Sequence, residues 1–296
     1  MPAKLLATLI GLIAILLWSV LALTTALTHR IPSFELLGLT FAVATLMGAA
    51  SWLFRPGATA ALRQPWPVWA LGVGGLFGYH AVYFEALKRA PPAEASLIAY
   101  LWPLLIVLFS AMLPGERLRW YHVAGALLGF AGVLALALAK GVSGFEMANG
   151  PGYALALACA FIWSGYSVLS RRFKAVPTDA VVGFCGVTCV LALVCHALFE
   201  TTIWPDAKEW LAIVGLGLGP VGLAFYAWDR GVKHGDIRLL GVASYATPVL
   251  STLILVAVGI ASPSLALALA VLLIVGGALI ASRDQLFPPR KPAVEV

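Results

Sequence analysis

The chain has 296 residues, of which 61% are hydrophobic and only 11% are charged. A soluble domain carries roughly 25% charged residues, so this composition excludes a water-soluble protein and predicts one embedded in a lipid bilayer. The net charge of +6 is better explained by charges that orient a membrane protein than by a nucleic acid partner.

Charged and turn residues divide the chain into ten apolar segments, each close to the roughly 20 residues that a helix needs to cross a bilayer. A cleaved signal peptide is an alternative for the first segment, but that apolar run is longer than a usual signal core. The predicted fold is therefore all-α. In chain order the segments lie near 5–28, 33–54, 67–87, 94–113, 119–139, 151–170, 178–199, 208–228, 237–259 and 263–282.

A shift of 145 residues brings the two halves of the chain into register without a gap. The matched residues are types that apolar segments rarely share by chance, among them Trp18 with Trp163, Tyr100 with Tyr245, and Pro103 with Pro248. An internal repeat in an apolar chain is typical of a transporter built from two structural copies with a site between them. We predict repeats at 1–145 and 146–284, followed by a short cytoplasmic tail at 285–296.

The basic residues indicate the orientation of the two repeats. With the N-terminus inside, fourteen of the 19 Lys and Arg residues fall on the cytoplasmic side, which the positive-inside rule favours. Five spans per repeat is an odd number, so the second copy enters from the opposite face. The sequence predicts inverted repeats around a central cavity, with both termini in the cytoplasm.

The third and eighth segments combine dense glycine with polar aromatic residues. Tyr79, His80 and Tyr83 lie on nearly one helix face, where they form either an interior polar cluster or the wall of a substrate cavity. In the eighth segment, Gly219 and Pro220 weaken the helix and indicate a hinge or close helix packing.

The fourth and ninth segments carry a repeated Tyr-x-x-Pro motif near the middle of each span. Tyr100 precedes Pro103, and Tyr245, beside Ser244, precedes Pro248. A proline at mid-span frees a backbone carbonyl, and paired kinks at equivalent places in two repeats indicate a central site. We predict that the tyrosines and Ser244 bind substrate and that the prolines kink the helices.

Three tryptophans complete the candidate site. Trp18 and Trp163 lie at mid-span, away from the interfaces where tryptophan usually collects, and their indole N–H groups need partners in the protein interior. Trp102 lies two residues after Tyr100 and would face elsewhere on a regular helix. It is the weaker candidate of the three.

The spans lack the groups that other mechanisms need. Their acidic residues lie near helix ends, so His80 is the sole plausible proton carrier and a pH gradient should drive transport only modestly. The four cysteines are predicted to be free thiols, and no metal, cofactor or catalytic motif is indicated. Lys88 and Lys233, equivalent in the repeat, mark helix ends or attract a substrate carboxylate.

On these residues the chain resembles the EamA family of the drug/metabolite transporter superfamily, and within it the exporters of aromatic amino acids. The resemblance implies ten helices in two inverted repeats, a basket-like cavity and amino acid export. The acidic turn after the fourth helix, at Glu116, has no acidic counterpart in the second repeat. The stretches that carry the resemblance are Ala7–Ala14, Leu17–Ser19, Tyr100–Pro103, Phe161–Trp163, Ser244–Tyr245 and Thr247–Ser251.

The sequence therefore favours a bacterial inner-membrane exporter of aromatic or other hydrophobic amino acids that works by alternating access. One alternative is an exporter of other metabolites or drugs on the same scaffold. A structural or lipid-handling membrane protein is another, although such a protein would not need a cluster of Tyr, Trp and His at mid-span.

Overall fold

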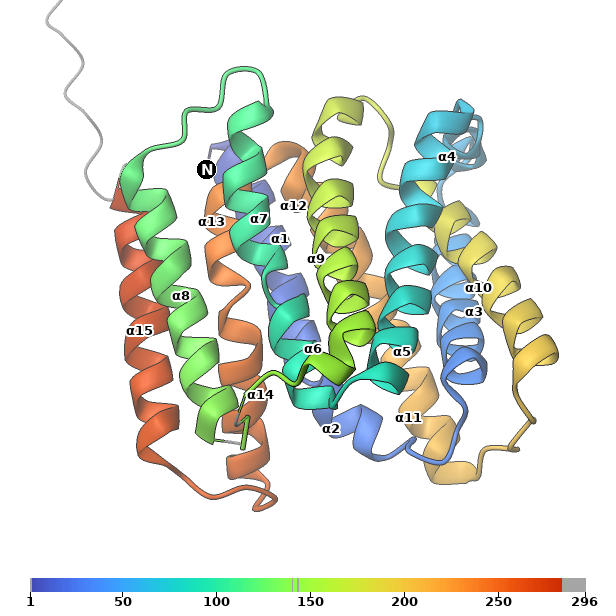
Figure 1. Cartoon of the computed structure of the whole chain (residues 1–296). Helices are drawn as coiled ribbons and strands as arrows, with labels where there is room; N and C mark the ends of the chain where they lie inside the picture. The colour runs from blue at the N-terminus through green and yellow to red at the C-terminus, as the bar shows by residue number, and fades with distance from the viewer. Residues whose placement is uncertain (1, 140, 143, 284–296) are drawn as a thin grey trace, which may run out of the picture.

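A computed structural model describes residues 2–139, 141–142 and 144–283, and within them all regular structure is helical (Figure 1). The tail predicted at 285–296 lies outside the described residues. The first half contains α1 (Ala3–Trp18), α2 (Leu21–Ala26), α3 (Ser33–Trp52), α4 (Trp66–Val73), α5 (Tyr79–Arg89), α6 (Pro92–Ala99), α7 (Trp102–Phe109) and α8 (Trp120–Ala139). The second contains α9 (Gly150–Ser170), α10 (Ala180–Phe199), α11 (Ala207–Leu218), α12 (Ala224–His234), α13 (Ile237–Ala243), α14 (Ala246–Ala257) and α15 (Leu265–Ala281).

Most of these helices, alone or joined end to end, are suited to a bilayer. Among the described residues, seven helical stretches are long and apolar enough to cross a membrane, and Ala3–Trp18 and Leu265–Ala281 are shorter apolar helices. Large apolar side chains such as Leu46, Leu211 and Leu272 are about 70% exposed or more, as expected for a surface that faces lipid tails.

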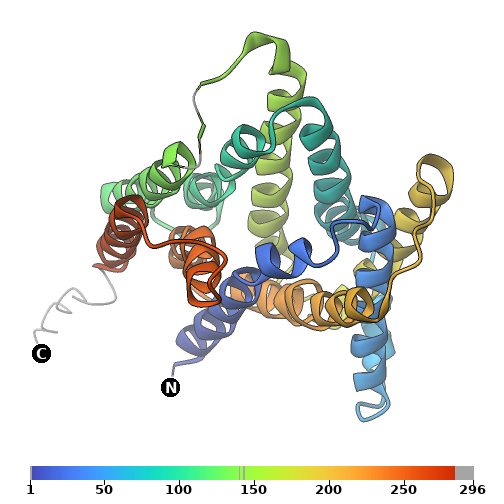
Figure 2. The ribbon, with the colours of Figure 1, turned by 90° about the horizontal axis from the view of Figure 1, so that it is seen from below.

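The connections between helices gather at two opposite faces of the bundle. We call upper the face at the top of Figure 1, which holds the start of α1 and the connections 113–119, 171–179 and 235–236. The lower face holds the connections 27–32, 90–91, 200–206 and 258–264. Figure 2 looks onto the lower face and shows helices of both repeats arranged around the centre.

Helix geometry is interrupted at equivalent places in the two repeats. A π-helical turn at Gly74–Gly78 joins α4 to α5, and another at Gly219–Leu223, 145 residues later, joins α11 to α12. Such turns leave backbone groups free and occur frequently at functional sites. A second pair of breaks separates α6 from α7 and α13 from α14. Pro103 and Pro248 lie in the first turns of α7 and α14, where proline is tolerated, so they start new helices instead of kinking continuous ones.

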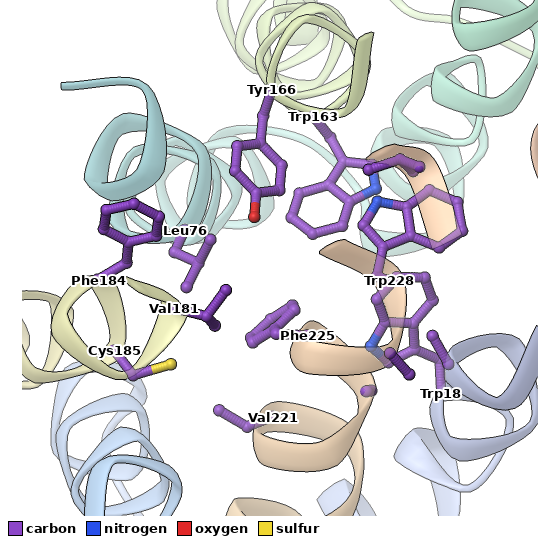
Figure 3. Packing of buried hydrophobic residues seen from close by; sticks show 14 of the residues in the cluster. Trp18, Leu76, Trp163, Tyr166, Val181, Phe184, Cys185, Val221, Phe225 and Trp228 are labelled. Carbon is purple, nitrogen blue, oxygen red and sulfur yellow. The ribbon is translucent and has the colours of Figure 1, made fainter. Parts of the chain in front are cut away.

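The largest hydrophobic core lies between the repeats and is rich in aromatic side chains. It joins Trp18, Phe41, Trp163, Phe225 and Trp228, all less than 9% exposed, and Figure 3 shows several of these rings converging from different helices. Because aromatic side chains bury 150–250 Å² each, this cluster stabilises the contact between the two halves. It also forms one end of the cavity described next.

Candidate substrate site

A cavity of about 820 Å³ extends into the bundle from the lower face. Exposed His29 and Ser33, in and beside the connection 27–32, line its mouth. At its inner end it meets Trp18, Trp163 and Phe225, behind which the structure is closed by the aromatic core. The volume matches that of small-molecule sites. The protein is therefore in a conformation open at the lower face.

The structure brings most of the predicted site residues to this cavity. They come from five places: α1, α5, the break after α6, the start of α7, and α9. Those that line it are Trp18, Tyr79, His80, Tyr83, Tyr100, Trp102 and Trp163, together with Pro220 of the π-helical turn.

Three tyrosine and tryptophan rings form one continuous wall. The rings of Tyr79 and Tyr83 stack with centroids 5.8 Å apart and an interplanar angle of 12°, and the ring of Tyr79 lies 5.6 Å from that of Trp163. The Tyr83 hydroxyl lies 2.8 Å from the Ser96 hydroxyl, which fixes the ring. A flat aromatic group can pack against this wall while hydroxyl groups hydrogen-bond its polar part.

His80 is held by the backbone of the π-helical turn. Its Nδ1 lies 2.7 Å from the carbonyl oxygen of Leu76, so Nδ1 carries the proton and donates. In the neutral ring Nε2 is then an acceptor. Phe41 packs edge-on against the ring, with centroids 5.6 Å apart. The side chain therefore presents to the cavity an imidazole that is fixed by its Nδ1 hydrogen bond.

Four tryptophans close the inner end of the cavity, and we call Trp18, Trp102, Trp163 and Trp228 the tryptophan cluster. Their ring centroids are 5.1 to 6.4 Å apart. The Trp18 indole donates to the carbonyl of Pro220 at 3.0 Å, a carbonyl that the π-helical turn leaves available. Figure 3 shows Trp18, Trp163 and Trp228 meeting beside Phe225.

The described residues that line the cavity include no Asp, Glu, Lys or Arg. Its polar groups are hydroxyls, imidazoles and backbone carbonyls, and its walls are otherwise aromatic or aliphatic. The arrangement can hold a small molecule with an apolar ring through packing and neutral hydrogen bonds. It offers no full countercharge to an ion.

Two predicted binding residues, Ser244 and Tyr245, do not line the cavity. Both are fully buried. The Ser244 hydroxyl donates to the carbonyl of Leu240 at 2.7 Å, and the backbone N–H of Leu104 donates to the Tyr245 hydroxyl at 3.1 Å. The break after α6 leaves that N–H without a helical partner, so Tyr245 supports the broken helix from behind the cavity wall.

The structure also adds lining residues that the sequence reasoning did not single out: Ser96, Phe225 and Thr247. Two of these three residues could have been predicted from the repeat. Phe225 is the equivalent of His80, and Thr247 that of Trp102. Applying the 145-residue shift to the candidate residues themselves indicates these positions.

The glycines near the π-helical turns divide into two kinds. A Cβ atom on Gly75 would lie 2.5 Å from the Tyr166 ring, and one on Gly217 would lie 2.8 Å from the Thr40 carbonyl oxygen. Gly74 has no atom within 4 Å, and Gly219 has only a Leu17 methyl group at 3.7 Å. The first pair serves helix packing. The second pair is not required for close packing.

Comparison with known proteins identifies the family to which this chain belongs. The model of the EamA-like transporter family matches residues 5–138 and 150–283. The chain is 62% identical to the aromatic amino acid exporter YddG of Ancylobacter novellus, over 93% of this chain and 96% of that protein. It is 29% identical to the protein of the same name from Escherichia coli, with the same coverage, and 27% identical to the pseudopaline exporter CntI of Pseudomonas aeruginosa, over 76% of this chain and 77% of that one.

A crystal structure of a protein 62% identical to this chain superposes with a TM-score of 0.91, covering 93% of this chain and 96% of the other. The two family matches fall one in each half, which confirms the family that the residues predict and its two-repeat architecture. The chain thus belongs to the EamA-like transporter family and is a multi-pass membrane transporter.

Proposed function

We propose that this transporter exports aromatic and other hydrophobic amino acids across the bacterial inner membrane by alternating access. The observation that carries the proposal is the cavity of about 820 Å³ with its wall of Tyr79, Tyr83 and Trp163. Its size suits a single amino acid, and its rings suit an aromatic side chain. The relatives from Ancylobacter novellus and Escherichia coli, both named aromatic amino acid exporters, support the same substrate class.

Topology is part of the proposal. Each five-helix repeat, 1–145 and 146–284, crosses the membrane in the opposite sense to the other, which makes ten crossings. The upper face is cytoplasmic because it carries the N-terminus and most of the basic residues. The cavity then opens to the outside, in the state that releases substrate.

Exchange of conformation between the repeats provides the transport step. The repeat-related π-helical turns at Gly74–Gly78 and Gly219–Leu223 are the places where α5 and α12 change direction relative to α4 and α11. Gly219 and Pro220 act as a hinge in the second repeat. Closing the lower half around the cavity while separating the tryptophan cluster opens the site to the cytoplasm.

Within the cavity, the aromatic ring of the substrate is held by Tyr79, Tyr83, Trp102 and Trp163. Trp18 closes the inner end of the space that this ring can occupy. The neutral Nε2 of His80 accepts a hydrogen bond from the substrate, and the Tyr100 hydroxyl provides a second polar contact. Tyr245 contributes indirectly, because its hydroxyl holds Leu104 in the first turn of α7, the helix that carries Trp102, whereas the Ser244 hydroxyl bonds within its own helix.

Competition transport tests the function. Liposomes containing the purified protein take up labelled phenylalanine, and unlabelled tryptophan, alanine and glutamate compete in parallel. We expect tryptophan to compete most strongly and glutamate least. Equal competition by all three would contradict an aromatic site. Cysteines at exposed Arg172 and Lys208 should be labelled from the cytoplasm and from outside, respectively, and labelling from one side would contradict the topology.

A second candidate is export of another metabolite on the same scaffold. The similarity to an exporter named for pseudopaline favours it. In the competition assay this candidate predicts weak inhibition by every free amino acid. The aromatic wall favours the first proposal.

A further inference from the structure

On the cytoplasmic side of the tryptophan cluster lies a buried ion pair that the cavity does not use. Lys233 Nζ lies 2.8 Å from one carboxylate oxygen of Asp229 and 3.0 Å from the other. The Lys233 and Asp229 side chains are only 3% and 2% exposed. Both residues are on α12, where Asp229 directly follows Trp228 and Lys233 lies one turn after Asp229. Full burial of two opposite charges is costly, so such a pair is retained for a reason other than stability alone.

The pair fastens α12 to the connection between α9 and α10. The Thr178 hydroxyl donates to Asp229 at 2.7 Å, and Lys233 donates to the carbonyl of Val176 at 3.1 Å. Next to Asp229, the Trp228 indole donates to the Ser167 hydroxyl of α9 at 3.0 Å. These bonds hold the upper half of α12 against the other wall of the closed cytoplasmic pathway.

A second, less buried layer lies nearer the cytoplasm. Arg171 donates to the carbonyls of Val232 and Gly235 at 3.0 and 2.9 Å and pairs with Glu116 at 2.8 Å. Arg238 also pairs with Glu116, at 3.3 Å. All of these contacts lie on the upper face and must separate before a molecule can reach the cavity from the cytoplasm.

The repeat has no such pair at its other end. The equivalent of Asp229 is Phe84, and the equivalent of Thr178 is Ser33, both of which line the open cavity. Lys88, the equivalent of Lys233, pairs with Glu85 at the surface, where the two side chains are 56% and 38% exposed. The buried charges therefore belong to the cytoplasmic entrance and not to the scaffold that both repeats share.

We propose that Asp229 and Lys233 form a second substrate site, at the cytoplasmic entrance, that recognises the zwitterionic head of an amino acid. In the closed state the two residues pair with each other. When α12 moves away from the connection between α9 and α10, Asp229 loses the Thr178 hydroxyl and Lys233 loses the Val176 carbonyl, and the ammonium and carboxylate of the substrate take these two places. This inference rests on the proposed export of amino acids and extends it to the entry step.

Charge balance supports this assignment. Moving α12 takes the Thr178 hydroxyl from Asp229 and the Val176 carbonyl from Lys233, and a charged group that loses a buried hydrogen-bond partner is strongly destabilised. A zwitterion supplies one charge of each sign and replaces both partners at once. An amine or a carboxylic acid replaces only one. The cavity beyond has no charged lining residue, so the head group is recognised by charge at entry and by neutral contacts before release.

The first test measures opening of the entrance by thiol labelling. Ser170, 3% exposed, lines a small void beside Asp229 and Lys233. Ser170→Cys is made in a protein whose four native cysteines are alanine, and a membrane-impermeant maleimide is added on the cytoplasmic side. We expect slow labelling that phenylalanine accelerates, with little acceleration by phenethylamine or phenylpropionate. Adding Asp229→Asn and Lys233→Met together should accelerate labelling without any ligand.

The second test measures selectivity of transport. The wild-type protein should prefer phenylalanine over phenethylamine and over phenylpropionate by at least about tenfold, the factor that one lost hydrogen bond to a charged group corresponds to. The Asp229→Asn/Lys233→Met variant should lose most of this preference while it still transports. The matched control is Glu85→Gln/Lys88→Met, which neutralises the exposed pair on the other face and should keep the preference.

The outcomes separate the two proposals. Unchanged labelling and selectivity in the Asp229→Asn/Lys233→Met variant, or equal loss of selectivity in the control, would overturn the entrance site. If phenylalanine neither accelerates labelling nor is transported by the wild type, amino acid export fails and recognition of a zwitterion fails with it. Rapid labelling of the ligand-free variant would in that case still identify the pair as the cytoplasmic gate.

Discussion

Helices α5 and α12 occupy equivalent places in the two repeats, yet their ends away from the π-helical turns differ in almost every polar contact. The end of α5 lies at the open mouth of the cavity, where Lys88 and Glu85 form an exposed pair. The end of α12 is covered by the connection between α9 and α10, where Lys233 and Asp229 are buried. The two repeats thus share one backbone architecture, but the side chains at the ends of α5 and α12 make different contacts.

This difference between α5 and α12 indicates how the pathway would close at each face of the protein, and we call these two closures the lower gate and the upper gate. Phe84 stands in α5 where α12 has Asp229, and it packs edge-on against Phe34 with ring centroids 5.5 Å apart. A gate at the lower face can therefore close through apolar contacts, whereas the gate at the upper face closes through charges. An apolar gate opens without leaving an ion unpaired, which suits the side at which substrate is released.

The largest expected effect is a difference in stability between two variants, each of which removes the lysine of one ion pair, Lys233–Asp229 or Lys88–Glu85. Lys233→Met leaves the carboxylate of Asp229 buried without a cation, so we expect a loss of about 3–5 kcal/mol in stability. Lys88→Met breaks an exposed pair and should cost about 1 kcal/mol or less. Thermal unfolding of both purified variants in one detergent measures the contrast, and equal shifts in Tm would contradict the burial of Lys233.

Alanine at equivalent glycines sharpens the comparison of packing. A Cβ on Gly217 would meet Val43 and lie 2.8 Å from the backbone carbonyl oxygen of Thr40, whereas the atoms nearest to one on Gly72 belong to the Phe184 side chain, which can shift more readily than a backbone carbonyl. We expect Gly217→Ala to cost about 1–3 kcal/mol and Gly72→Ala less. Gly215→Ala, with no atom within 4 Å, is the control and should be neutral. Equal unfolding temperatures would argue against close packing of α11 on α3.

Removing one aromatic wall should alter selectivity. An aromatic pair contributes roughly 0.5–1.5 kcal/mol beyond area burial. Trp163→Ala and Tyr100→Ala should therefore each weaken the binding of phenylalanine by up to about tenfold. Threonine, which lacks a ring, should be affected less. The measurement is competition transport by variants that insert normally, with Trp204→Ala, exposed in the connection 200–206, as the control. Equal losses for phenylalanine and threonine would make these residues structural.

The smallest effect concerns the turns that follow α5 and α12. Asp236 in the upper turn has Pro91 as its equivalent in the lower one. Burial raises the pKa of Asp236, but nearby Lys4, the Leu239 amide and Arg238 outweigh it, so the pKa lies below its ordinary value. A depressed pKa contributes stability above the unfolded value of about 3.9 that is lost as pH falls through the folded pKa.

Asp236→Asn should therefore change stability little at pH 7, by about 1 kcal/mol or less, since asparagine also caps helices well. It should flatten part of the loss of stability below about pH 4. Unfolding temperatures from pH 3 to 7 measure this slope. Lys4→Met serves as a partial control because it removes the nearby cation that lowers this pKa most. A wild-type slope in Asp236→Asn would assign the acid sensitivity to other carboxylates.

The repeat alone could not show that the side chains of Tyr100 and Tyr245 lie in different environments. Both follow from the same motif, yet Tyr100 lines the cavity and Tyr245 is buried behind it. The Tyr245 ring packs where a Cβ on Gly129 of α8 would lie. The equivalent of Gly129 is Ile274, so the second repeat has no glycine at this position.

The sequence by itself determined the membrane environment, the two repeats, the family and the residues that build the aromatic wall. The membrane environment follows from composition, the repeats from a period of 145 residues, the wall from residue spacing on a helix face, and the family from the resemblance of motifs, all of which are properties of the chain read in one dimension. Only the tertiary structure decided that the cavity opens at one face, that Tyr245 supports a broken helix, and that Asp229 and Lys233 are buried. In the sequence those two residues look like an ordinary surface pair near a helix end. Their burial depends on a connection more than fifty residues away in the chain, which packing alone brings over them.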